Sequence, residues 1–68
     1  MLLPNGSAIK LDVIEAFHKA TANPENIYTS GGINWDFVSA DMCMDLNAFY
    51  NFDYINDCME ALADNYFA

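Results

Sequence analysis

The sequence has very few positive charges. Its 68 residues contain no arginine, two lysines (Lys10 and Lys19) and one histidine, His18. The stretch 20–68 has no Lys, Arg or His, but it holds eight Asp and Glu residues, and the formal net charge is −8. A surface of one sign repels itself but associates faster with a surface of opposite charge. The imbalance therefore predicts a basic partner, with improved solubility of a small apolar protein as the alternative explanation.

Long apolar runs are missing as well, and we expect no leader segment. No apolar stretch approaches the roughly 18 residues of a membrane-spanning helix, and the opening residues MLLPNG lack the pattern of a secretory signal. We therefore expect a cytoplasmic protein that does not associate with membranes. In that compartment Cys43 and Cys58 are expected to be reduced and to pack as small apolar side chains, with a disulfide as the less favoured alternative.

Patterns for catalysis and metal binding are also absent. The sequence contains no G-x-S-x-G, H-E-x-x-H or phosphate-binding glycine loop. A calcium loop needs a central glycine, which the segment 36–47 lacks. Zinc needs more clustered ligands than Cys43, Cys58 and His18 provide. We predict no enzymatic activity, no cofactor and no metal site.

Apolar residues, in contrast, are abundant at 54% of the chain, with 15% aromatic. This supply lets a single domain of residues 1–68 fold without a metal or a disulfide, and it argues against disorder. Apolar spacing predicts three helices, at about 12–22, 35–48 and 53–65. Short extended pieces around Asn5-Gly6 and at 27–29 predict a minor β element. The expected fold class is α+β, with a short N-terminal β element and three helices.

Polar residues mark the expected helix ends. Asp12 is expected to cap the first helix, Asn34 the second, and either Asn51 or Asp53 the third. Asn23 before a proline should end the first helix, because that position avoids the α conformation. The second helix has apolar residues on opposite sides, so we expect it to be covered on more than one face and to form the centre of the fold.

The third helix has the most informative pattern. Four carboxylates fall within about 60° of one another, opposite its apolar residues: Asp53, Asp57, Glu60 and Asp64. They cover about 16 Å of helix, over which one DNA strand carries about five charges. Asp41 and Asp45, also four residues apart, extend this surface if the second helix packs alongside, and Asp36 is a weaker member.

This arrangement of like charges has an energetic cost. Like charges four residues apart destabilise a helix, and a carboxylate near the C-terminus, as at Asp64, opposes the helix dipole. A surface that serves only solubility usually mixes both signs. We therefore predict that the acidic face binds a partner, with an unpartnered solvated face as the alternative.

Aromatic residues gather between the second and third expected helices. Most of them are expected to belong to the core. Tyr54, however, lies beside Asp53 and Asp57, so an arginine of a partner could pair with a carboxylate while stacking on the tyrosine ring. Tyr54 therefore joins the predicted partner-binding residues.

The small size, the cation-free stretch 20–68, the acidic stripe of the third helix and the segment INWDFV at 33–38 together resemble a known group of proteins. They are similar to the small acidic proteins of phages and mobile elements, in particular anti-CRISPR proteins that act as DNA mimics. Anti-CRISPRs share no common fold, so this resemblance implies neither an architecture nor site residues. It implies an inhibitor in a bacterial host, with a CRISPR surveillance complex as partner, bound at the basic surface that engages the PAM or the target duplex.

The expected function is inhibition by occlusion. The acidic face occupies a site lined by Lys and Arg, which recognises phosphates largely by charge, and the protein itself binds no nucleic acid. It acts as a monomer or a small homo-oligomer. Two alternatives are an anti-restriction DNA mimic and an acidic modulator of a toxin or transcription factor. A third is a small adaptor or assembly protein that uses an apolar surface, with Met42, Met44 and Met59 as flexible contacts.

Overall fold

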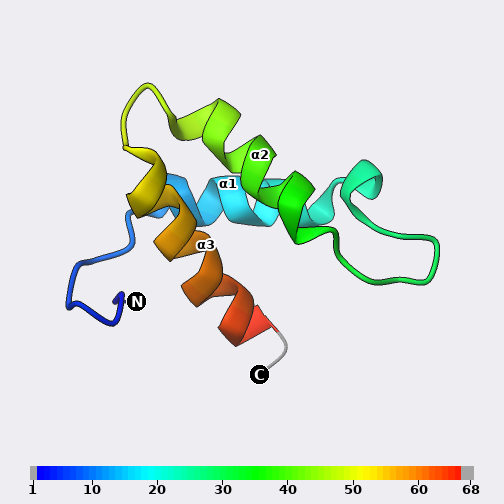
Figure 1. Ribbon diagram of the computed structural model, residues 1–68, viewed down its shortest axis with the longest axis horizontal. Coiled ribbons are helices and arrows are strands. Elements are labelled where there is room, and N and C mark those ends of the chain that lie inside the picture. Colours follow the sequence, from blue (N-terminus) through cyan, green and yellow to red (C-terminus); the bar gives the residue numbers. More distant parts are fainter. Residues whose placement is uncertain (1, 67–68) are drawn as a thin grey trace.

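The computed structural model describes residues 2–66, which form three α-helices and a short 3-10 helix. They are α1 (Leu11–Ala22), η1 (Pro24–Asn26), α2 (Trp35–Leu46) and α3 (Phe52–Tyr66). Each α-helix contacts the other two. Figure 1 shows α1 behind α2 and α3, with the loop between η1 and α2 extending away from the helices.

The expectation of an α+β fold is wrong, since no strand or sheet forms within residues 2–66. The expected β pieces shrink to two single bridges, which join Leu2 to Ala8 and Ile27 to Ile33. Gly6 lies in the turn expected at Asn5-Gly6, with φ 88°, and Gly31 lies in a second turn, with φ 91°, a conformation that costs glycine little. The extended segment on each side of a turn is too short to form further bridges, and a lone hairpin is marginally stable in water. The protein is predominantly helical.

The three predicted helices are confirmed, with ends within two residues of the expected positions. The Asn34 side chain accepts a hydrogen bond from the Phe37 N–H at 3.3 Å, so it caps α2 as predicted. The Asn51 side chain accepts from the Tyr54 N–H at 2.8 Å. Asn51, rather than Asp53, therefore caps α3.

The start of α1 differs from the prediction. Lys10 stands at the N-cap position and makes no side-chain capping bond, while Asp12 lies inside the first turn. Its carboxylate accepts hydrogen bonds from the Val13 N–H at 2.9 Å and from the Tyr50 hydroxyl at 2.9 Å. Asp12 thus ties α1 to the α2–α3 junction instead of capping the helix. The helix does end at Ala22, before Asn23, as predicted.

The core lies in the seams between the helices and the segment 2–10. Its buried apolar side chains are Leu3, Ile9, Val13, Ala16, Phe17, Ala20, Val38, Met42, Leu46, Ile55, Cys58, Met59 and Leu62. The molecule measures 35 × 28 × 17 Å. Its thickness holds two helix layers, with α1 in one layer and α2 and α3 in the other (Figure 1).

The prediction that α2 is covered on more than one face is wrong. Val38, Met42 and Leu46 are buried, but Phe37 and Met44 on the other side are 54% and 77% exposed. The elements that pack against α2 within residues 2–66 are α1, α3 and η1, and they leave Phe37 and Met44 uncovered. The apolar residues of α2 therefore divide into a core face and an exposed face.

Candidate acidic interface

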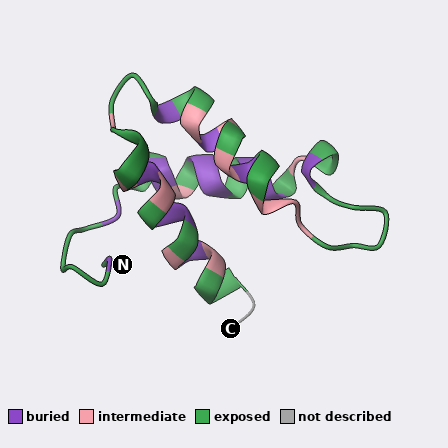
Figure 2. Cartoon of the chain, viewed as in Figure 1, coloured by how far each residue is buried: buried purple, intermediate pink, exposed green. Residues whose placement is uncertain are grey.

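The exposed side of α3 carries the carboxylates that the sequence predicts. The side of α3 that faces the core holds Ile55, Cys58, Met59 and Leu62. The opposite side holds four exposed carboxylates, called here the α3 row: Asp53, Asp57, Glu60 and Asp64. Figure 2 shows exposed and buried residues alternating along this helix. The helical backbone thus fixes the spacing of the α3 row.

No lysine or histidine within residues 2–66 forms an ion pair with the α3 row. Asn56 donates a hydrogen bond from Nδ2 to Glu60 Oε1 at 3.4 Å, a neutral contact that leaves the charge uncompensated. Negative charges three and four residues apart on one helix repel each other. The α3 row is therefore a surface whose electrostatic energy falls when positive charge approaches.

A depression of about 530 Å³ runs beside the α3 row. One wall is the segment 2–5, and the other consists of Asp57, Glu60 and Asp64 with Ala61 and Asn65. Leu3 anchors the first wall because it is buried in the core, whereas Leu2 is 64% exposed. Three carboxylates therefore border one concave surface whose opposite wall includes the apolar residues Leu2, Leu3 and Pro4. This wall could not be predicted from the sequence, since only the tertiary burial of Leu3 places it there.

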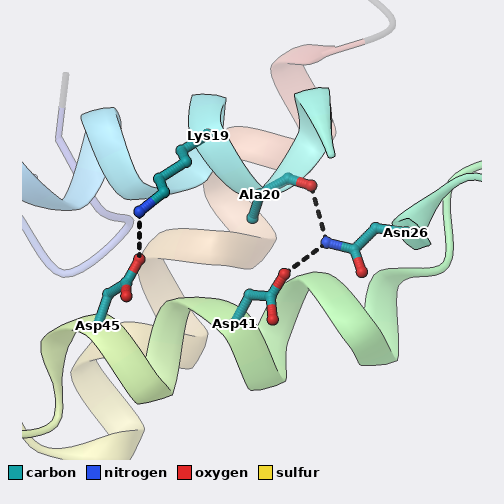
Figure 3. A network of polar contacts seen from close by, with 5 residues as sticks. All are labelled: Lys19, Ala20, Asn26, Asp41 and Asp45. Carbon is teal, nitrogen blue, oxygen red and sulfur yellow. Dashed lines mark hydrogen bonds and ion pairs between the residues drawn. The ribbon is translucent and has the colours of Figure 1, made fainter. Parts of the chain in front are cut away.

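Asp41 and Asp45 have different surroundings, although they are also four residues apart. Figure 3 shows both side chains on the side of α2 that faces α1. Asn26 Nδ2 donates to Asp41 Oδ2 at 2.7 Å and to the carbonyl oxygen of Ala20 at 2.9 Å. Lys19 Nζ lies 4.0 Å from Asp45 Oδ2. These two carboxylates, called here the α2 pair, therefore contact α1 and η1, while the α3 row borders the N-terminal segment.

Asn26 is the residue of this region that sequence reasoning did not identify. It is only 3% exposed, and burying an amide is costly unless its polar atoms are bonded. Its side chain joins the end of α1 to α2, and its backbone carbonyl accepts from the Asn34 N–H at 2.8 Å. The sequence N-P-E-N indicates a turn here but contains no sign that this asparagine is buried.

Tyr54, predicted to stack on a partner's arginine, uses its hydroxyl inside the protein. It donates to the carbonyl oxygen of Ala8 at 2.7 Å and accepts from the Lys10 N–H at 3.2 Å. Burial raises the pKa of the Tyr54 phenol. A hydrogen bond to the Asp12 carboxylate raises the pKa of Tyr50, whose ring lies 5.2 Å from that of Tyr54. Both phenols hold the start of the chain against the α2–α3 junction, and a partner contact of Tyr54 stays a prediction.

The remaining predicted site residues are Asp36 and the three methionines. Asp36 is exposed in the first turn of α2. Met42 and Met59 belong to the core, so of the methionines named for an apolar contact surface only Met44 is exposed. Cys43 and Cys58 are free thiols. Burial raises the pKa of Cys58, which keeps it protonated and unreactive near neutral pH.

The described part of the chain, residues 2–66, contains no group of three or more His, Cys, Asp or Glu side chains placed to hold a metal ion. None of its helices has the length and apolar character that crossing a bilayer requires. A scan against protein families and searches of curated proteins and solved structures found no match to this chain.

Proposed function

We propose that the protein acts by binding, without catalysis, and that the α3 row occupies a basic nucleic-acid-binding surface of another protein and excludes nucleic acid from it. The observation that carries this proposal is the α3 row itself: four exposed carboxylates on one side of one helix, without an ion pair in the described chain. A helix holds its charges at fixed spacing. The α3 row therefore needs little ordering when it binds, unlike an unstructured acidic segment.

The energetics favour a cationic partner. Lys and Arg side chains that approach the α3 row relieve the repulsion among its carboxylates and form charge-assisted hydrogen bonds. The depression beside the row is large enough for an extended Arg or Lys side chain, whose apolar stem can lie along Leu2 while its head meets Asp57 or Glu60. A groove that binds phosphate by charge offers such side chains in a row.

The proposed partner is a nucleic-acid-binding protein of the cytoplasm of a bacterial host. The resemblance to anti-CRISPR DNA mimics makes a CRISPR surveillance complex the first target to test, at the surface that engages the PAM or the target duplex. A restriction enzyme offers a similar basic groove and is the second target. In both cases the protein competes with DNA and does not bind it.

The central experiment reverses two charges of the α3 row. Asp57→Lys combined with Glu60→Lys should lower affinity for the target at least about 100-fold, because it removes two attractive charges and adds two repulsive ones. The matched control is Glu15→Lys combined with Glu25→Lys, which changes net charge equally at exposed positions outside α3. The measurement is competition between the protein and a labelled DNA duplex for the purified target, with circular dichroism as the test of folding.

Salt provides the second measurement. Affinity should fall steeply between low and physiological ionic strength, since screening weakens exposed charge pairs. A pull-down with tagged protein from cells with and without a CRISPR system identifies which target class is bound. Unchanged competition by the α3 double variant contradicts the proposal. An equal loss in both double variants shows that net charge, and not the α3 row, governs binding.

A further inference from the structure

The outer side of α2 has an exposed apolar stripe. It consists of Phe37, Ala40 and Met44, which are three and four residues apart and therefore lie on one side of the helix. Phe37 is 54% exposed, Met44 is 77% exposed, and Ala40 is exposed between them. We call these three residues the α2 stripe. It is a second surface, on a different helix from the α3 row.

Carboxylates border the α2 stripe on both sides. At about 100° per residue, Asp36 falls on one flank, and Asp41 and Asp45 fall on the other. Asp36 is exposed. The Lys19–Asp45 ion pair spans 4.0 Å between side chains that are 79% and 47% exposed, so it is weak and open to exchange. The stripe is thus an apolar strip between two acidic edges.

Charge decides which occupant fits such a surface. A second copy of this chain would bring its own carboxylates against these edges, and the chain has no arginine and only two lysines to offset them. Like charges placed across an interface are costly. A helix with apolar residues on one side and Lys or Arg on both flanks matches the apolar strip and the acidic edges together.

We propose that the α2 stripe is a docking surface for an amphipathic basic helix of a partner protein. Apolar side chains of that helix pack against Phe37 and Met44, and Met44 adapts to their shape because its thioether chain is unbranched and flexible. Basic side chains on the flanks of the partner helix pair with Asp36 and Asp45. The inference is independent of the proposed function, since it rests on residues of α2 and not on the α3 row.

The test uses two synthetic helical peptides of about 18 residues, long enough to form a helix. The first carries Leu at every heptad a and d position with Lys at e and g. The second has the same composition with the Leu positions scattered, so that both peptides have equal charge. In fluorescence anisotropy titrations at about 0.15 M salt, the first peptide should bind at least about 10-fold more tightly than the second, and the ratio of the two affinities is the readout.

Variants of the α2 stripe test where the first peptide binds. Met44→Glu and Phe37→Ser should each reduce the ratio to about one. Phe49→Ser should leave it unchanged, because Phe49 is 74% exposed but lines a different depression, with Tyr50 and Tyr54. The α3 double variant, Asp57→Lys with Glu60→Lys, should also leave it unchanged, which separates this inference from the proposed function.

Several results overturn the inference. Equal affinity of the two peptides shows attraction by charge alone, and an unchanged ratio in Met44→Glu places the contact elsewhere. Loss of the ratio in the α3 double variant moves the site to α3. A dimer in analytical ultracentrifugation that Met44→Glu dissociates makes a second copy of the chain the occupant.

Discussion

The α3 row and the α2 pair have the same spacing along a helix but opposite surroundings. Asp53 and Asp57 face solvent, whereas Asp41 receives a hydrogen bond from buried Asn26 and Asp45 lies 4.0 Å from Lys19. The difference comes from the neighbouring elements, because α1 and η1 lie against that side of α2 (Figure 3), whereas the carboxylates of the α3 row are exposed. Asp41 therefore contributes to stability and Asp45 adds only a weak, exposed ion pair, whereas the α3 row costs stability.

The largest expected effect concerns the α2 pair. Asp41→Ala removes a charged acceptor from the buried Asn26 amide, so it should lower the free energy of unfolding by about 1.5–3 kcal/mol. Asp57→Ala is the matched control in the α3 row and should change it by less than about 0.5 kcal/mol. Urea unfolding followed by circular dichroism measures both. Equal losses of unfolding free energy in the two variants would contradict the distinction between the α2 pair and the α3 row.

The next largest effect on stability is expected at alkaline pH, and it comes from groups outside the α3 row and the α2 pair. Burial raises the pKa of Cys58 and of Tyr54, and the Asp12 hydrogen bond raises that of Tyr50. Folding therefore favours the protonated forms, and stability should decline as the pH rises above the ordinary thiol and phenol values of about 8.5 and 10. Urea midpoints between pH 7 and 11 test this, and Tyr50→Phe should flatten the decline. A midpoint that rises with pH would contradict the direction of all three shifts.

A smaller effect of opposite sign is expected in the α3 row. Asp57→Asn removes like-charge repulsion with Asp53 and Glu60, so it should raise the free energy of unfolding by about 0.5 kcal/mol at low salt. The gain should shrink in high salt as the repulsion is screened. Asp41→Asn, measured in the same way, should lower the free energy of unfolding. The two variants should therefore change stability in opposite directions. A destabilised Asp57→Asn would mean that the α3 row holds the fold together.

The smallest effect belongs to the ion pair. A double-mutant cycle with Lys19→Ala and Asp45→Ala should give a coupling energy of about 0.5 kcal/mol or less, because both side chains are exposed. The contrast between Asp41 and Asp45 then separates a hydrogen bond to a buried amide from a surface ion pair. A coupling energy above about 1.5 kcal/mol between Lys19 and Asp45 would instead place Asp45 in one structural network with Asp41.

Local patterns in the sequence predict the helices and the α3 row because both depend on residues close together in the chain. Asn34 and Asn51 cap helices, and the four-residue spacing of Asp53 and Asp57 puts them on one side of α3 whatever the tertiary fold. The prediction of a β element was wrong because a turn at Gly6 or Gly31 does not by itself supply partners for further strand pairing. The intramolecular contacts of the α2 pair could not be predicted from the sequence for a related reason, since Asn26 and Lys19 reach it only through the packing of α1 against α2.

The 17 Å thickness of the molecule affects how it responds to a missing core side chain. In a thick domain, truncation of a core residue leaves a dry cavity sealed on all sides. Here Phe17 packs against the rings of Trp35 and Tyr66, each at a ring distance of 6.1 Å, and both rings are partly exposed, so truncating Phe17 would open a channel that solvent enters. Water in that channel would exchange freely with bulk, and backbone amides of α1 that are shielded in the intact seam would lose their protection against hydrogen exchange.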